Sequence, residues 1–341
     1  MPEVRTINLA LQGGGAHGAF TWGVLDRLLE DDGIAIEGLS GTSAGAVNAV
    51  VLAQGFADGG APGARKALDD FWYDLSNLAA FSPAQRTFVD WLTGNWNLDR
   101  SPAAIFFDMF TRLVSPYDGN PANLNGLRNL LADRIDLKRV RACHPLKLFI
   151  SATNVRTGKG RVFQGPEITL DAILASACLP TVFQAVVIDG EPYWDGGYMG
   201  NPSIWPLIYG CQSRDVAIVQ INPLVREKTP RSSAEIMNRL NEITFNSALI
   251  GEMRAIAAVQ RLIENGELTE SGGGRLKKML VHLISDPAEM QDLGVASKFN
   301  LGRPFLEHLR GIGRAAADRW LAANRDRLGV EASIDIRNVF L

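Results

Sequence analysis

The chain alternates short apolar runs with longer segments whose apolar residues recur every three or four positions. The run Arg5 to Gln12 (RTINLALQ) is typical of a buried strand. The segment Ala19 to Glu30 follows it and predicts a helix, because Trp22, Leu25 and Leu29 fall at helical spacing. Since this order of strand and helix recurs, the sequence predicts an α/β fold built in layers.

The same pattern predicts further elements along the chain. The expected strands are Ile34 to Gly41, Leu146 to Val155, Val186 to Asp189, Asp215 to Asn222 and Lys278 to Ser285. The expected long helices are Ser43 to Gln54, Ser232 to Asn265 and Pro304 to Arg327. The part of the chain beyond residue 208 is therefore expected to complete the sheet and to add a helical extension.

Two stretches interrupt this alternation. A Gly/Pro-rich linker is predicted at Ala57 to Pro62 (ADGGAP). Beyond it, Phe71 to Tyr117 holds eleven of the 27 aromatic residues, within a predicted helical insertion at about 63–135. This insertion is either additional core or an apolar cap over an acyl-binding pocket. The helix expected around Ala103 to Val114 could contact a membrane only if it exposed an apolar face.

Composition excludes several classes of protein. The 341 residues make one large domain or two ordinary ones, and the net charge of -3 leaves no broad basic field for nucleic acid. Three cysteines without C-x-x-C spacing favour reduced thiols in a cytoplasmic protein over disulfides or a zinc site; they are Cys143, Cys178 and Cys211. The sequence shows neither a secretory leader pattern nor an apolar run long enough to span a bilayer.

The first candidate for chemistry is the loop QGGGAHG, Gln12 to Gly18, between a predicted strand and helix. Successive glycines allow backbone N–H groups to converge on a phosphate or on the oxyanion of an acyl-transfer intermediate. A dinucleotide site would need an acidic residue at the end of the second strand. Because the sequence there reads EGLSGTSAG, dinucleotide binding is disfavoured.

The second candidate is Gly41 to Gly45, which reads G-x-S-x-G around Ser43. This pattern fits a nucleophile elbow, a sharp turn from strand to helix that presents a hydroxyl. An ordinary turn with Ser43 as a helix cap is the alternative. Neighbouring parallel strands end at the same edge of a sheet, so the glycine loop and this turn are expected to face each other across one pocket.

A serine hydroxyl needs a base to take its proton. The chain has four histidines, and none lies in a long loop after a final strand, where an α/β-hydrolase keeps its catalytic histidine; they are His17, His144, His282 and His308. His282 is interpreted as a core residue, because its strand is apolar on both sides.

The remaining base is Asp195, in EPYWDGGYMGNP. One interpretation is a hairpin turn of the D-G type. The other is a carboxylate on a tight loop, partly desolvated by the two aromatic residues before it. Because desolvation raises the pKa of a carboxylate, it would make Asp195 a better base.

Four elements together resemble the patatin-like phospholipase family, in that family's order. They are the glycine loop Gly13 to Gly18, the turn Gly41 to Gly45, the segment Ala175 to Pro180 (ASACLP, resembling A-S-x-x-x-P) and Asp195-Gly196-Gly197 (resembling D-G-[GA]). The resemblance covers roughly Ile7 to Leu207. One departure is His17, since the family often has Arg or Lys there. A histidine would supply a weaker or pH-dependent charge.

The resemblance implies a three-layer α/β/α fold with a mostly parallel sheet, and a role for each motif. Ser43 is the implied nucleophile and Asp195 its sole base. The implied oxyanion hole is formed by backbone N–H groups of Gly13, Gly14 and Gly15. Residues that support these motifs are His17, Gly18, Gly41, Gly45, Gly196 and Gly197. Ser176 is expected to shape the pocket floor instead of acting as the nucleophile.

The implied function is hydrolysis of carboxylic esters in acyl lipids through an acyl-enzyme, without metal or cofactor. The expected partner is an acyl lipid or ester, with peripheral contact to a membrane surface left open and no nucleic acid. The expected division is a catalytic domain at 5–208 and a C-terminal part at 209–341. An acyltransferase, a histidine-assisted α/β-hydrolase and a non-catalytic lipid-binding protein are the alternatives. The head group, the acyl chain and the oligomeric state are not determined by the sequence.

Overall fold

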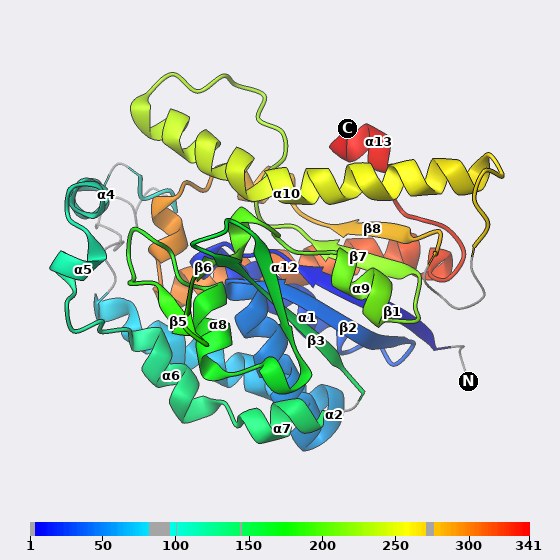
Figure 1. Ribbon diagram of the computed structural model, residues 1–341, viewed down its shortest axis with the longest axis horizontal. Coiled ribbons are helices and arrows are strands. Elements are labelled where there is room, and N and C mark those ends of the chain that lie inside the picture. Colours follow the sequence, from blue (N-terminus) through cyan, green and yellow to red (C-terminus); the bar gives the residue numbers. More distant parts are fainter. Residues whose placement is uncertain (1–3, 82–95, 100, 144, 271–275) are drawn as a thin grey trace.

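The computed structural model describes residues 4–81, 96–99, 101–143, 145–270 and 276–341. One eight-stranded sheet runs through the molecule (Figure 1). Five of its strands are parallel; in spatial order they are β3 (Lys147–Asn154), β2 (Ile34–Thr42), β1 (Arg5–Leu11), β7 (Asp215–Val219) and β8 (Leu280–Ile284). The predicted strands in these places are confirmed, each with ends displaced by a few residues.

Three antiparallel strands complete the sheet beside β3. They are β4 (Gly160–Gln164), β5 (Val186–Ile188) and β6 (Glu191–Asp195). The sequence pattern predicted only β5. A D-G hairpin turn does occur, but at Asp189 and Gly190, which both have positive φ, of 52° and 80°. The prediction that Asp195 lies on a loop is therefore wrong, because it is the last residue of β6.

Helices cover both faces of the sheet, which confirms the three-layer fold. One face packs against α1 (Gly18–Leu28), α2 (Ala44–Ser76), α8 (Leu170–Ser176) and α12 (Arg303–Asn324). The other packs against α9 (Trp205–Gly210), α10 (Ser233–Glu264) and α13 (Ile336–Phe340). Strand β7 supplies both layers, since Ala217 and Val219 point to the first core and Val216 and Ile218 to the second.

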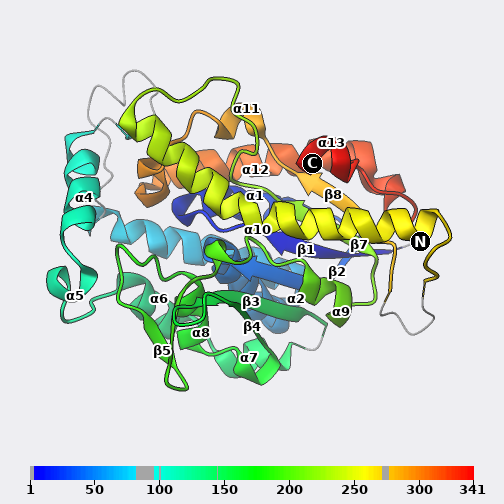
Figure 2. The ribbon, with the colours of Figure 1, turned by 45° about the horizontal axis from the view of Figure 1, so that its top comes forward.

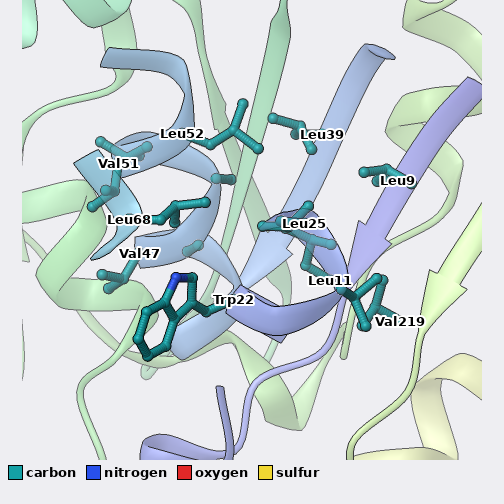
Figure 3. Packing of buried hydrophobic residues seen from close by; sticks show 14 of the residues in the cluster. Leu9, Leu11, Trp22, Leu25, Leu39, Val47, Val51, Leu52, Leu68 and Val219 are labelled. Carbon is teal, nitrogen blue, oxygen red and sulfur yellow. The ribbon is translucent and has the colours of Figure 1, made fainter. Parts of the chain in front are cut away.

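The larger core lies between β1, β2 and the helices α1 and α2. Figure 3 shows Leu9 and Leu11 of β1 facing Leu25 of α1, with Leu52 of α2 next to Leu39 of β2. These side chains are fully buried. Because both helices begin at the carboxyl ends of their strands, this packing fixes the two turns that precede them.

The predicted linker at residues 57–62 is instead a kink inside α2, at Gly59 and Gly60. Gly60 has a φ of 61°, which only glycine adopts readily, so one helical segment turns sharply into the next. The described part of the predicted insertion is helical, with α4 (Pro102–Leu113), α5 (Pro116–Gly119), α6 (Gly126–Arg134) and α7 (Leu137–Ala142) after α2. Much of the aromatic segment at 88–98 lies outside the described residues.

The remaining described helix is α11 (Pro287–Met290), and short 3-10 turns join several of the elements. Figures 1 and 2 both place α4 and α5 at one end of the molecule, away from the amino-terminal end of the sheet. Among the described residues, no helix is both long enough and apolar enough to cross a membrane.

Helices α1 and α12 approach so closely that glycines are required between them. A Cβ at Gly313 would overlap the carbonyl oxygen of Phe20, and one at Gly23 would overlap that of Arg310. The buried carboxylate of Asp26 reinforces this contact by pairing with Arg310 and Arg314 of α12. The C-terminal helix is thereby held against the first helix of the chain.

Substitution of two glycines in α12 tests this contact. We expect Gly313→Ala to lower the free energy of unfolding by about 1–3 kcal/mol, because the methyl group has no space. The matched control is Gly311→Ala, two residues away, where a Cβ would meet no atom within 4 Å. That control should raise the free energy of unfolding by about 0.5–1 kcal/mol. Urea denaturation followed by circular dichroism measures both, and equal effects would contradict the close packing.

Candidate active site

Ser43 occupies a strained turn between β2 and α2. Its φ of 55° lies in the left-handed region, which a residue with a side chain rarely adopts. The flanking glycines permit this turn, because a Cβ at Gly41 would overlap the backbone of Gly45, and a Cβ at Gly45 would overlap the Leu11 carbonyl. Such a strained turn from strand to helix is the geometry that a nucleophile elbow would require.

The glycine loop lies directly beside this turn, as expected from the parallel pairing of β1 and β2. A Cβ at Gly13 would lie 2.6 Å from the Cβ of Ser43. Two asparagines fix Gly13: its N–H donates to Oδ1 of Asn201 at 2.7 Å, and its carbonyl accepts from Nδ2 of Asn222 at 2.9 Å. Because its N–H is already engaged, Gly13 is removed from the three expected oxyanion donors.

The other two N–H groups differ from that of Gly13. No described residue accepts a hydrogen bond from the N–H of Gly14 or of Gly15. Gly15 has a φ of 58°, and its backbone lies against that of Lys298. These two N–H groups are thus among the donors of the loop that no described residue engages and that could meet a ligand oxygen.

Strand β3 brings Asp195 to the same place. One edge of β3 pairs with β2 as far as Ser151, which is opposite Thr42, and β4 pairs with β3 over the same residues. Beyond Ser151 the register with β6 begins, with Asp195 opposite Ala152. Since β4 also occupies these positions, β6 must continue the edge used by β2. Asp195 therefore lies next to the end of β2, and that strand ends at Thr42, the residue before Ser43.

The carboxylate of Asp195 is fully buried. Its Oδ1 accepts a hydrogen bond of 2.8 Å from the N–H of Gly197, which orients the group. Its Oδ2 has no partner of ordinary hydrogen-bond geometry among the described residues, although the Ser43 hydroxyl is close enough to stabilise its charge. Burial raises the pKa of Asp195 to about 6, against the opposing effects of Gly197, Ser43 and Lys298.

Ser176 has a contact that the sequence did not indicate. At the end of α8, its Oγ accepts a hydrogen bond of 2.9 Å from the backbone N–H of Ser43. Both groups are buried. The A-S-x-x-x-P segment thus supports the strained turn directly, since it satisfies an N–H that α2 leaves without a partner.

His17 carries no charge at neutral pH. Its side chain is buried, and burial holds the pKa of the imidazole well below its usual range, an effect to which the nearby Lys298 adds. Its Nε2 is 2.8 Å from Oγ of Ser297. Desolvation disfavours the charged form of the ring, so a charge on this loop at neutral pH is not expected from His17.

The other described histidines lie elsewhere. His282 is buried in β8, with its Nε2 2.9 Å from Oδ1 of Asp215, which confirms its interpretation as a core residue. His308 belongs to α12, and its ring stacks on the ring of Trp96. His144 lies outside the described residues. Cys178 is buried, and desolvation raises the pKa of its thiol to about 12, which disfavours the reactive thiolate at neutral pH.

A polar network holds the glycine loop, and its members beyond residue 208 lie in no sequence motif. Oε1 of Gln12 accepts hydrogen bonds of 2.9 Å from the N–H groups of Ile221 and Asn222. Nε2 of Gln12 donates to the carbonyl of Asn201 and to Oδ1 of Asn246. Only the fold brings these buried amides together.

The structure is thus an α/β protein with one mostly parallel sheet and a strained serine turn at the end of a central strand. A family model described as patatin-like phospholipase matches residues 9–208, and the chain belongs to that family. Among solved structures, VipD from Legionella pneumophila is similar at 16% identity and a TM-score of 0.37. That match covers 89% of this chain but only 66% of the VipD chain. No curated protein matches.

The contact between Ser176 and Ser43 can be tested by stability. We expect Ser176→Ala to lower the free energy of unfolding by about 1–3 kcal/mol, because the buried N–H of Ser43 loses its acceptor. The control is Ser233→Ala on the exposed start of α10, which should change it by less than about 0.5 kcal/mol. Urea titration gives both values. A Ser176 variant as stable as the control would refute the supporting role.

Proposed function

We propose that the protein is a serine hydrolase that cleaves carboxylic ester bonds of acyl lipids. The observation that carries this proposal is the position of Ser43, on a strained turn between a buried carboxylate and a glycine loop. A serine held this way has a base on one side and oxyanion donors on the other. Membership of the patatin-like phospholipase family supports the same class of reaction.

In the first step, Asp195 accepts the proton of the Ser43 hydroxyl while the serine oxygen attacks the ester carbonyl. A pKa of about 6 leaves Asp195 mostly ionised at neutral pH and more basic than an ordinary aspartate. The N–H groups of Gly14 and Gly15 then stabilise the negative oxygen of the tetrahedral intermediate. The positive end of α2, which begins right after Ser43, favours the same charge.

The intermediate collapses with departure of the alcohol, which takes the proton from Asp195 and leaves an acyl group on Ser43. Asp195 next removes a proton from water as the oxygen of that water attacks the acyl-serine. The fatty acid then departs, and Asp195 returns the proton to the Ser43 oxygen. The same acyl-serine could pass its acyl group to another alcohol. Acyl transfer is therefore the alternative function, and adding glycerol or lysophospholipid as acceptor distinguishes the two products.

Two substitutions test the reaction. We expect Ser43→Ala and Asp195→Asn each to lower kcat/KM for a long-chain ester about a thousandfold or more, because each removes one member of an interdependent pair. The matched control is Asp189→Asn, an exposed aspartate on the β5–β6 turn, which should keep full activity. Release of p-nitrophenol from acyl esters and of fatty acid from phosphatidylcholine measures the rates. Substantial activity of a folded Asp195→Asn variant would rule out the proposed base.

The substrate is proposed to arrive from a lipid surface contacted by α4. Five large apolar side chains lie on one arc of this helix and are exposed: Ile105, Phe106, Met109, Phe110 and Leu113. The opposite side of α4 packs inward, with the ring of Phe107 5.4 Å from that of Phe299. Phe299 adjoins Lys298, which packs against the glycine loop, so the inward side of α4 is connected to the candidate site through this turn while the apolar arc stays exposed.

Removing two rings from this arc tests the contact. We expect the double substitution Phe106→Ser and Phe110→Ser to weaken binding to phosphatidylcholine vesicles at least about tenfold, because less apolar surface enters the interface. Hydrolysis of a short soluble ester should not change. The control is Val330→Ser, which is also exposed but remote from α4. Vesicle cosedimentation gives the affinity, and equal binding by both variants would disprove contact through α4.

A further inference from the structure

Lys298 lies against the candidate site although it is far from the motifs in sequence. It belongs to a 3-10 turn at Ala296–Phe299, outside the region matched by the family. A Cβ at Gly15 would lie 2.5 Å from the carbonyl oxygen of Lys298, so the turn touches the glycine loop. The loop that is proposed to bind the oxyanion is thus packed directly on a lysine.

The ammonium group of Lys298 is held by neutral partners. Its Nζ donates to Oδ1 of Asn222 at 2.9 Å and to Oδ1 of Asn241 at 3.1 Å. It also lies 5.6 Å from the centre of the Phe245 ring. Among the described residues, no carboxylate comes within salt-bridge distance of it. Two of its three N–H donors are thus used, and its charge is not neutralised by direct contact.

Phe245 connects this cation to Asp195. A Cβ at Gly197 would overlap the Phe245 ring, so the ring is in contact with the turn that follows Asp195. Lys298 and the Asp195–Gly197 turn therefore both lie against the same aromatic ring. The low dielectric of such a setting lets the two opposite charges interact over a distance at which water would screen them.

The other charged groups around Lys298 are already paired or bonded. Glu242 of α10 forms ion pairs with Arg226 and Arg239. Asp99 accepts hydrogen bonds from Asn238 and from the N–H of Ala296. His17 is neutral, as described above.

Asp195 and Asp99 are thus the carboxylates near Lys298 that form no ion pair among the described residues, and Asp195 is the one that lies in the candidate site. Desolvation lowers the pKa of Lys298 to about 8, while Glu242, Asp195 and Asp99 oppose that change and Arg226 adds to it.

We propose that Lys298 is a positioning residue that keeps Asp195 ionised and makes the glycine loop electrostatically favourable for an oxyanion. This inference rests on the proposed ester hydrolysis. Lys298 is half-buried, and a lysine that served only to hold the turn would not need a charge there, because a partly desolvated charge without a salt bridge costs stability. Titratable groups whose proton affinity is perturbed by burial and by one specific partner are typical of functional sites.

The proposal predicts two limits in the pH profile of kcat/KM. Activity falls as pH drops through about 6, because protonated Asp195 cannot accept a proton. It falls again as pH rises through about 8, because neutral Lys298 no longer favours the oxyanion. The acidic limit reflects Asp195, which gains its negative charge on deprotonation. The alkaline limit reflects Lys298, which loses its positive charge on deprotonation.

Three variants separate these limits. In Lys298→Met, the acidic limit should move up by about half a pH unit or more, since Asp195 loses a favourable charge. The alkaline limit should vanish, with a maximal rate about tenfold lower. In Lys298→Arg, the maximal rate should be largely retained and the alkaline limit should vanish, because arginine stays protonated. In Asn241→Asp, the alkaline limit should move to higher pH, because the new carboxylate favours the ammonium.

The control for a change in total charge is Lys147→Met. Lys147 pairs with Glu37 at the start of β3, the end of the strand away from Ser43. It should leave both limits unchanged. If active, folded Lys298 variants keep the wild-type limits, the inference is wrong and the hydrolase proposal stands. If the wild-type protein hydrolyses no ester, the hydrolase proposal fails, and the titration below still tests the coupling.

Titration of the ammonium group by NMR requires no activity. The ¹³Cε signal of Lys298, assigned by its absence in Lys298→Met, should titrate near pH 8 in the wild-type protein. In Asp195→Asn its midpoint should move to lower pH, since Asp195 favours the charged form. Asp189→Asn should leave it unchanged. A midpoint that is the same in wild type and Asp195→Asn would overturn the coupling between the two groups.

Discussion

The candidate site depends on one edge of β3 that pairs with two different strands. Strand β2 uses this edge up to Ser151, and β6 uses it from Ala152 onward. Two segments that are about 150 residues apart in sequence therefore end against each other. Ser43 leaves the sheet where β2 stops, and Asp195 reaches the same point as the last residue of β6. A shift in either register would separate the hydroxyl from the carboxylate.

Burial then sets the proton affinity of the carboxylate and the environment of the serine turn. Asp195 is enclosed completely, with one oxygen oriented by Gly197, so desolvation raises its pKa to about 6. A hydrogen bond to Ser176 stabilises the turn at Ser43, and hydrogen bonds to Asn201 and Asn222 stabilise the glycine loop beside it. Strain in the turn and desolvation of the carboxylate both cost stability, and the surrounding hydrogen bonds offset that cost.

The C-terminal third contributes more to the site than its lack of motifs suggested. Strand β7 lies beside β1, and Asn222 just beyond it bonds to the glycine loop. Helix α12 is locked onto α1, and the 3-10 turn that carries Lys298 lies just before it. The positive charge beside the glycine loop thus comes from Lys298, because burial disfavours the charged form of His17 within the loop. The division at residue 208 remains a prediction, although one sheet contains strands from both sides of it.

The sequence alone determined the alternation of strands and helices, the parallel sheet, the two glycine-rich turns and the family. These follow from local spacing, since periodicity and glycine act within a few residues. Tertiary structure alone decided that Asp195 ends a strand and that Asn201 accepts the hydrogen bond of the Gly13 N–H. It also decided that the turn carrying Lys298 packs against the glycine loop. Antiparallel β4 and β6 escaped prediction because short strands depend on their neighbours for pairing. Charge and proton affinity also depend on burial and distant partners, which one-dimensional patterns do not contain.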